Sequence, residues 1–200
     1  MKTAISNRLA EFKSWGNETD KGVFAELCFC ILTPQTKARI CDRAIRSLLV
    51  GGTLFNGTAE QVGAHLIGVR FPRVKSRYIV EARNDFLCDG HWTLKQRLDR
   101  FDNPIEARDW LATNILGLGY KEAGHFLRNI GRGEDLAILD RHVLKNLHRN
   151  GVIARVPDSL SKKEYMRIEG LMREFSKTIG IPMAHLDILF WSMETGEIFK

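Results

Sequence analysis

The chain has 200 residues, of which 44% are apolar and 27% charged, and only five are proline. This composition is typical of a folded globular protein and excludes collagen-like, disordered and membrane-embedded classes. Thirty Lys and Arg against 24 Asp and Glu leave a net charge of +6, which favours a polyanionic partner without establishing one, because many basic proteins never touch nucleic acid.

Helical periodicity predicts the first two elements. Apolar side chains recur every three to four residues at Ile5, Leu9, Phe12 and Trp15, which indicates an amphipathic helix. The next run, Val23 to Leu32, is apolar almost all round, as expected for a helix buried on every side. Its uninterrupted part is too short to span a bilayer, and the first residues lack the apolar core of a signal peptide. We therefore expect an intracellular protein, cytoplasmic or at the nucleoid, without membrane contact.

Helix-start signals recur along the rest of the chain. Thr33 before Pro34 predicts a helix from about Gln35 to Leu49 that stops at the glycines 51 and 52. Further N-caps are predicted at Thr58, Thr93, Asn103 and Ser161. Alternating strand patterns are nearly absent, so the predicted class is all-α. No linker of biased composition separates the halves, so any two lobes must share helices.

Four cysteines are present, at positions 28, 30, 41 and 88, and no two have the C-x-x-C spacing. They lie in or beside apolar helical stretches. We expect buried thiols that act as small apolar side chains, without a disulfide framework or a metal cluster.

The most informative stretch runs from Asn114 to Leu147. It contains two predicted helices, about Pro104 to Ile115 and Tyr120 to Ile130, joined by the short turn Leu116-Gly-Leu-Gly119. The two glycines permit positive φ and close backbone approach, which lets amide groups at the second helix's start face outward and bind phosphate. An ordinary helical hairpin, whose glycines only make the turn, is the alternative.

Lys121 lies in the first turn of the second helix, and nineteen residues later Asp140 ends the apolar run Leu136–Leu139, just before a helix predicted at Arg141–Leu147. In order and spacing this segment resembles the helix-hairpin-helix DNA glycosylases, the superfamily of endonuclease III and the 8-oxoguanine DNA glycosylases. The resemblance implies a two-lobed helical fold with the active site in the cleft between the lobes. The whole chain would be one catalytic unit, with lobe one at about 34–124 and lobe two at about 1–33 plus 125–200.

The resemblance further implies that Lys121 is the Schiff-base nucleophile, Asp140 the catalytic carboxylate, and Gly117, Leu118 and Gly119 a DNA-backbone clamp. Lysine attacks only as the neutral amine, and desolvation and the positive end of a helix both disfavour the ammonium. The carboxylate would stabilise the positive charge that develops on the sugar. Taken singly, Lys121 could be a solvated helix lysine and Asp140 a simple N-cap.

Two further segments are expected to face DNA. The Leu32–Thr36 segment, L-T-P-Q-T, looks like the family's motif near the opening of the cleft, which places Gln35 and Thr36 against DNA. The Arg70–Arg77 stretch, R-F-P-R-V-K-S-R, offers four basic side chains around one aromatic, and from it we expect Arg73 and Lys75 to bind the backbone. A structural helix start explains either segment as well.

The end of the chain indicates the branch. Endonuclease III and its adenine-removing relatives end in four cysteines that hold an iron–sulfur cluster, whereas this chain has no cysteine after Cys88. With the short length and the terminal Lys200, it resembles the compact type-2 8-oxoguanine DNA glycosylase/lyase family. That resemblance implies that Lys200 contacts the flipped base or closes its pocket and that Trp191 lines or supports the pocket; core packing is the alternative for Trp191.

Rejecting guanine requires an acceptor for the extra N7–H of 8-oxoguanine. The sequence offers a carbonyl near residues 182–184, the Asp187 carboxylate or the terminal carboxylate, and does not choose among them. The expected function is excision of 8-oxoguanine from duplex DNA by a bifunctional glycosylase/lyase, through a lysine imine and β-elimination. The alternatives are a glycosylase/lyase for oxidised pyrimidines and a non-catalytic DNA-binding hairpin module.

The expected enzyme is a monomer whose chemistry uses no metal and no iron–sulfur cluster. The resemblance does suggest that carbonyls of the hairpin, from Ile115, Leu118 or their neighbours, could bind a monovalent cation that bridges to phosphate.

Overall fold

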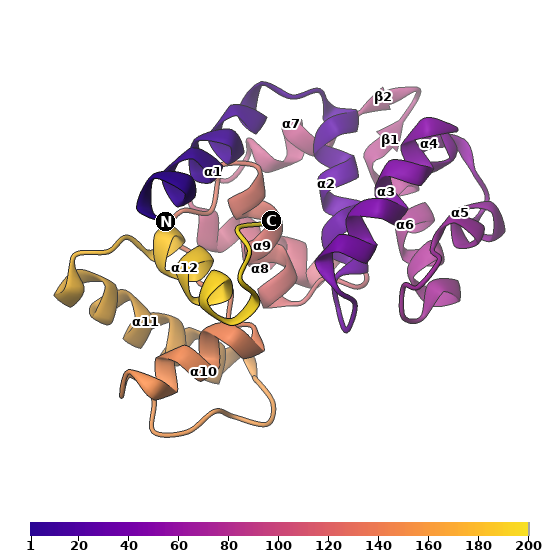
Figure 1. Cartoon of the computed structure of the whole chain (residues 1–200). Helices are drawn as coiled ribbons and strands as arrows, with labels where there is room; N and C mark the ends of the chain where they lie inside the picture. The colour runs from indigo at the N-terminus through magenta and orange to yellow at the C-terminus, as the bar shows by residue number, and fades with distance from the viewer. Residues whose placement is uncertain (200) are drawn as a thin grey trace. The chain divides into compact units, whose positions relative to one another are not determined.

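A computed structural model describes residues 1–199, and Lys200 lies outside the described residues. The regular secondary structure of the described chain is almost all helix, as Figure 1 shows, which confirms the predicted all-α class. The helices are α1 (Lys2–Ser14), α2 (Asp20–Leu32), α3 (Ala38–Val50), α4 (Thr53–Asn56), α5 (Ala59–His65), α6 (Pro72–Phe86), α7 (Leu94–Leu98), α8 (Pro104–Asn114), α9 (Tyr120–Asn129), α10 (Arg141–Arg149), α11 (Lys162–Ile179) and α12 (Met183–Thr195). A 3-10 turn, η1, covers Trp15–Asn17, and strands β1 (Leu87–Cys88) and β2 (His91–Trp92) pair antiparallel.

The chain divides into two compact units, one formed by Asn17–Phe126 and the other by Met1–Gly16 with Leu127–Lys200. The expected lobes, about 34–124 and 1–33 plus 125–200, stay a prediction. The compact units differ from them mainly over residues 17–33, because α2 packs against α3, α6 and α7 and therefore belongs to the first unit.

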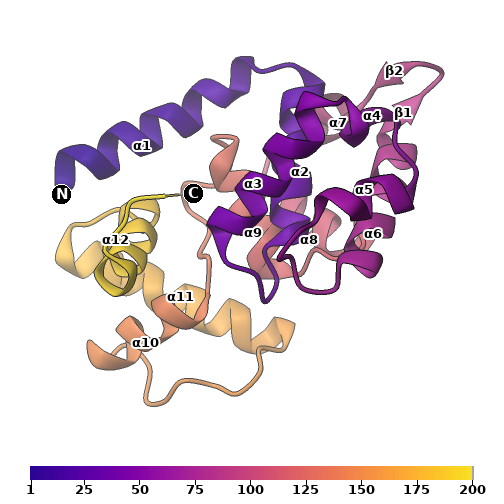
Figure 2. The same ribbon diagram turned by 45° about the vertical axis from the view of Figure 1, so that its right-hand side comes forward.

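The first unit is built around α2. Thr19 caps this helix by accepting a hydrogen bond from the Gly22 amide, and every residue from Val23 to Leu32 is buried, as the continuous apolar run predicted. Figure 2 shows α2 among the helices that cover it. Phe24 also contacts Trp92 of the small hairpin, with ring centroids 4.8 Å apart. The sequence analysis did not predict this hairpin, because two-residue strands carry no alternating pattern.

The second unit packs α1 against α12. Three members of the predicted apolar face, Ile5, Leu9 and Phe12, are buried against Ala184 and Ile188. The fourth, Trp15, lies in the 3-10 turn after α1. Helix α12 also contacts α10 and α11, so it is the centre of this unit. The helix ends at Gly196, whose positive φ of 75° is a common way to close a helix.

Several predicted helix starts are confirmed, whereas one lacks its cap bond and one is wrong. Thr58 forms a capping box with Gln61, and Asn103 and Ser161 cap α8 and α11. Thr93 makes no cap bond, because its hydroxyl instead donates to the Phe86 carbonyl. The helix expected from Gln35 begins only at Ala38, because residues 33–36 form a turn in which the Thr36 amide donates to the Thr33 carbonyl.

The cysteines form no disulfide. Cys28, Cys30 and Cys41 are buried as expected, whereas Cys88 is exposed on β1, so the prediction of burial is wrong for that residue. Burial raises the pKa of Cys41 to about 11, although the Lys75 ammonium acts in the opposite direction. Burial also raises the pKa of Cys28. Over residues 1–199, no helix combines the length and the apolar character needed to cross a bilayer.

Candidate active site

The hairpin between α8 and α9 has the predicted form. Ile115 and Leu118 are buried beneath the turn, and the Leu118 amide donates to the Ile115 carbonyl. Gly117 has a φ of +86°, and a Cβ there would lie 2.7 Å from Cδ2 of Tyr78, so both conformation and space require glycine. Gly119 does not use the positive φ that glycine permits. The turn is therefore held by one glycine and two buried aliphatic side chains.

Lys121 lies in the first turn of α9 and is partly exposed, with 27% of its side chain accessible. Its Nζ is 2.9 Å from Oε1 of Glu122. The other carboxylate oxygen of Glu122 accepts a hydrogen bond from the Gly119 amide at 3.3 Å, which is one half of a capping box. One residue thus fixes the turn and contacts the predicted nucleophile. Glu122 was not among the predicted site residues, although its spacing of three residues from Gly119 is the capping signal.

Asp140 caps α10, because its Oδ1 accepts a hydrogen bond from the Val143 amide at 2.8 Å. The side chain is partly exposed, whereas the preceding residues Leu136–Leu139 are all buried. Lys121 belongs to the unit Asn17–Phe126 and Asp140 to the other unit, so their joint action stays a prediction.

The turn after α2 carries the predicted residues Gln35 and Thr36. Gln35 is exposed and has a φ of 56°, which is uncommon for a residue with a side chain. Thr36 is partly exposed, and its hydroxyl oxygen accepts a hydrogen bond from the Arg70 amide at 3.1 Å. The turn is therefore joined to the segment that connects α5 to α6.

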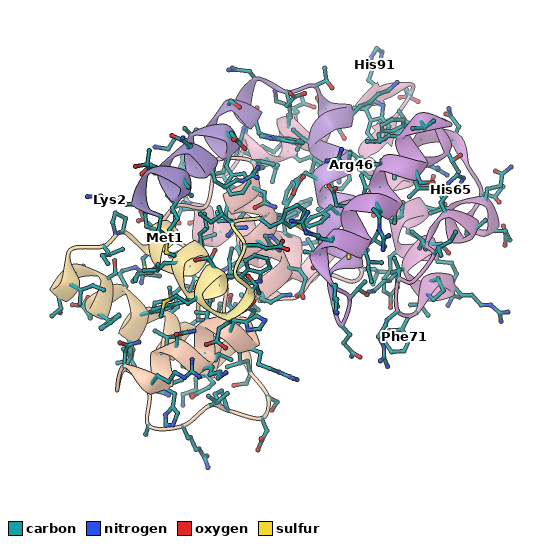
Figure 3. All side chains as sticks on the ribbon, in the orientation of Figure 1. Met1, Lys2, Arg46, His65, Phe71 and His91 are labelled. Atoms are coloured by element: carbon teal, nitrogen blue, oxygen red, sulfur yellow. The ribbon has the colours of Figure 1, made fainter. Side chains whose placement is uncertain are left out.

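That connecting segment ends in Phe71, which has a φ of 58° and a relative exposure of 51%. Its ring projects away from the ribbon in Figure 3. Arg73 is exposed as expected. Phe71 is the one aromatic residue in the predicted basic stretch, but it was not among the predicted site residues. An apolar side chain before proline in a basic segment was the available signal.

The structure argues against the expectation that Lys75 binds the DNA backbone. Only 4% of the residue is exposed, and its ammonium is enclosed by oxygen atoms of the turn after α2. Burial lowers its pKa, with smaller contributions of either sign from surrounding charges. Residues two positions apart on a helix point to nearly opposite faces, so Lys75 lies on the inner face of α6 while Arg73 is exposed. The basic composition of the segment alone did not indicate this difference.

Asp187, a candidate contact for the base, is already paired within the protein. It is buried in α12, and its carboxylate accepts a hydrogen bond from the guanidinium of buried Arg128. Arg128 further bonds Oδ1 of Asn129 and lies over the ring of Phe12, 5.0 Å from its centroid. A carboxylate held in a buried ion pair is costly to redirect, so this finding argues against Asp187 as the acceptor for a base.

Trp191 is partly buried on α12, and Lys200 lies outside the described residues. The roles expected for both in base recognition stay predictions. Within residues 1–199, no cluster of three or more His, Cys, Asp or Glu side chains is placed to hold a metal ion.

Comparison with known proteins gives full-length matches. The model of a family described as 8-oxoguanine DNA glycosylase matches residues 5–181. A Fusobacterium nucleatum protein named 8-oxoguanine DNA glycosylase/AP lyase is 44% identical over 201 residues, covering 100% of this chain and 93% of its own. A Methanocaldococcus jannaschii protein of the same name is 37% identical over 202 residues, with the same coverage of both chains.

Two solved structures are similar over the whole chain. One is the Methanocaldococcus jannaschii 8-oxoguanine glycosylase/lyase in complex with a 15-mer DNA containing 8-oxoguanine, with a TM-score of 0.90 and 36% identity, covering 100% of this chain and 93% of that one. The other is the 8-oxoguanine DNA glycosylase of Thermotoga maritima, with a TM-score of 0.87 and 35% identity, covering 100% and 92%.

Proposed function

The chain belongs to the 8-oxoguanine DNA glycosylase family, and on this premise we propose that it is a bifunctional DNA glycosylase/AP lyase that excises 8-oxoguanine from duplex DNA. The observation that carries the proposal is the place of Lys121, in the first turn of the helix that follows a glycine hairpin, in a chain whose whole length matches a protein of that name. The enzyme would act as a monomer at the nucleoid.

In the proposed reaction, the neutral amine of Lys121 attacks C1′ of the damaged nucleotide. The glycosidic bond breaks, and the base leaves with the bonding electron pair and takes up a proton. The sugar ring then opens to an imine, which acidifies the proton at C2′. Loss of that proton expels the 3′-phosphate, and water releases Lys121 from the imine. These steps nick the strand on the 3′ side and consume only water.

Asp140 would stabilise the positive charge on the sugar as the glycosidic bond breaks, because a carboxylate near C1′ lowers the energy of that transition state. Its N-cap bond to Val143 fixes the direction of the side chain. A residue that is anchored in this way needs little reorganisation during the reaction. No step of the proposal is assigned to a metal ion or an iron–sulfur cluster.

DNA would be held by the hairpin at Gly117–Gly119, by exposed Arg73 and by the turn that carries Gln35 and Thr36. The damaged base must leave the duplex to be reached, which costs a few kcal/mol and requires a side chain that replaces it or stacks on its neighbours. Phe71 is suited to stacking, because it is aromatic, exposed and flanked by arginines.

Two of the candidate acceptors for the N7–H are already engaged within the protein. Asp187 pairs with Arg128, and the Pro182 carbonyl accepts the amides of His185 and Leu186. Lys200 would contact the flipped base or close its pocket. Trp191 would line or support the base pocket.

The proposal is tested with a duplex that contains a single 8-oxoguanine. Wild-type protein is expected to release the base, nick the strand and form a covalent adduct with DNA in the presence of borohydride. Lys121→Gln should lose the adduct and the nick, whereas Lys177→Gln, which removes an exposed lysine on α11, should keep both. An adduct that persists in Lys121→Gln refutes the assigned nucleophile.

The same assay separates the alternative functions. Preferred cleavage at oxidised pyrimidines in a panel of single-lesion duplexes would identify a different substrate. Binding without base release or nicking, by folded protein, would identify a DNA-binding module without catalysis.

A further inference from the structure

We propose that Lys75 is a positioning residue that joins two exposed loops into one DNA-binding edge. The loops are residues 33–37, between α2 and α3, and residues 66–71, between α5 and α6, and we call them the loop pair. This inference rests on the proposed function, because it assigns the loop pair to the DNA substrate. It replaces the phosphate contact expected of Lys75 with a role inside the protein.

The buried ammonium of Lys75 makes three hydrogen bonds. Its Nζ donates to the carbonyl oxygens of Leu32 and Pro34, both at 2.7 Å, and to Oγ1 of Thr36 at 3.2 Å. An ammonium group has three protons, so these acceptors use its full capacity. Leu32 is the last residue of α2, where a helix leaves carbonyls without intrahelical partners and carries partial negative charge. Lys75 thus ties the end of α2 to the turn that follows.

The second step is the connection between the loops. Oγ1 of Thr36 accepts a hydrogen bond from Lys75 and another, at 3.1 Å, from the backbone amide of Arg70 in the other loop. A single hydroxyl oxygen therefore joins both loops and the buried ammonium. Loss of Lys75 removes one of the two hydrogen bonds that this oxygen accepts, together with the two bonds to the Leu32 and Pro34 carbonyls.

The third step is what the loop pair presents. Gln35 and Phe71, one in each loop, are both exposed and both in the left-handed backbone region, with φ of 56° and 58°. Non-glycine residues in this region cost of order 1 kcal/mol or more each and persist where the surrounding structure holds them, often at functional sites. The two tips offer an amide and an aromatic ring, the groups that hydrogen-bond and stack on bases.

Burial of the Lys75 ammonium costs free energy. Burying an ammonium is unfavourable, and an apolar side chain of similar size is often as good or better for stability alone. Lys75 instead provides three directed bonds to one turn. Fixing the geometry of the loop pair explains a charge at this position better than core stability does.

The same helix supplies a matched control. Arg83 of α6 is also buried, with 8% exposed, and donates to the carbonyls of Leu54 and Gly57 at 3.3 and 2.8 Å. It holds α4 and the residue after it, and not the loop pair. Lys75→Met and Arg83→Met therefore each remove a buried cation from α6, but only the first frees the loop pair.

The experiment measures the affinity for an 8-oxoguanine duplex against salt concentration, in a Lys121→Gln background that prevents turnover. Lys75→Met should weaken binding tenfold or more with an unchanged salt slope, because no phosphate contact is lost. Arg83→Met should bind within about twofold of its parent. Arg73→Ala is the positive control for a phosphate contact and should reduce the slope by about one. The proposal is overturned if Lys75→Met matches Arg83→Met, or if it reduces the slope as Arg73→Ala does.

A second measurement does not depend on DNA. A nitroxide at position 35 (Gln35→Cys), in a Cys88→Ser chain whose other cysteines are buried, reports the motion of the first loop. Lys75→Met should increase its mobility, and Arg83→Met should not. If Lys75→Met does not fold, Thr36→Val serves in its place, because it removes the shared acceptor and keeps the side-chain shape. Unchanged mobility in the folded variant contradicts the proposal.

The two proposals fail in different ways. A wild-type protein that neither releases 8-oxoguanine nor nicks DNA refutes the proposed function, whereas the nitroxide still tests the role of Lys75. An active wild type with a fully active, tightly binding Lys75→Met refutes the role of Lys75 alone.

Discussion

Tyr165 donates its hydroxyl proton to the carbonyl of Ala137 at 2.6 Å, and so ties the first turn of α11 to the segment that leads into Asp140. The same hydroxyl oxygen accepts the Leu139 amide at 3.3 Å. Both bonds are buried. In the described part of the chain, residues 136–139 pair with no β-strand, so the Tyr165 hydroxyl supplies hydrogen bonds that a neighbouring strand would otherwise make.

Tyr165→Phe should therefore destabilise the protein by about 1–3 kcal/mol, because it leaves a buried carbonyl and a buried amide without their partner. Denaturant unfolding measures this loss. Base release should also slow at temperatures where the variant is folded, since Asp140 follows the released segment. Unchanged stability would show that the segment is held by apolar packing alone.

Asp140 combines a structural and a proposed chemical role that two substitutions separate. Asparagine caps helices as well as aspartate does, so Asp140→Asn should change the free energy of unfolding by less than about 0.5 kcal/mol, whereas Asp140→Ala should cost about 1 kcal/mol. Single-turnover base release should fall in both, by about a hundredfold or more, because both remove the charge. A fully active Asp140→Asn would reduce the residue to an N-cap.

Alanine substitutions at Gly117 and Gly180 test whether the hairpin requires glycine at position 117. Both have positive φ, but a Cβ at Gly117 meets Tyr78, whereas a Cβ at Gly180 meets no atom within 4 Å. Gly180→Ala should cost roughly 1–2 kcal/mol through backbone strain alone. Gly117→Ala should cost more and should also weaken DNA binding. Equal losses in stability and affinity for the two variants would contradict the role assigned to the hairpin.

Thiol reactivity tests the burial of the cysteines. At pH 8 the native protein should react quickly with a thiol reagent at Cys88 only. Cys41 should remain protonated and shielded, because burial raises its pKa to about 11, so the fraction of thiolate is small. Unfolding should expose all four cysteines. Rapid modification of more than one thiol in the native protein would contradict the described core.

The sequence predicted those parts of the fold that depend on local signals. The apolar faces of α1 and α2, the cap at Asn103 and the glycine turn at 117 are each encoded within a few residues, and each is confirmed. The prediction that a helix begins at Gln35 was wrong: Thr-Pro is a common helix start, but residues 33–36 form a turn. Its actual course depends on Lys75, which lies some forty residues further along the chain.

For the candidate site, residue types were easier to predict than surroundings. Arg73 and Lys75 look alike in the sequence, and only the orientation of α6 makes one exposed and the other buried. Asp187 was considered as a base contact because an acid near a pocket is a plausible acceptor. Its partner Arg128 lies 59 positions away, a pairing that no local pattern indicates.

The left-handed backbone at Gln35 and Phe71 has a consequence for engineering. Glycine would adopt either conformation without steric cost, so selection for heat resistance alone has a simple route to change at these two positions. Such variants would have an equal or higher melting temperature but would lose the Gln35 amide and the Phe71 ring. A screen for thermostable forms of this enzyme should therefore score repair of a lesion together with survival of heating.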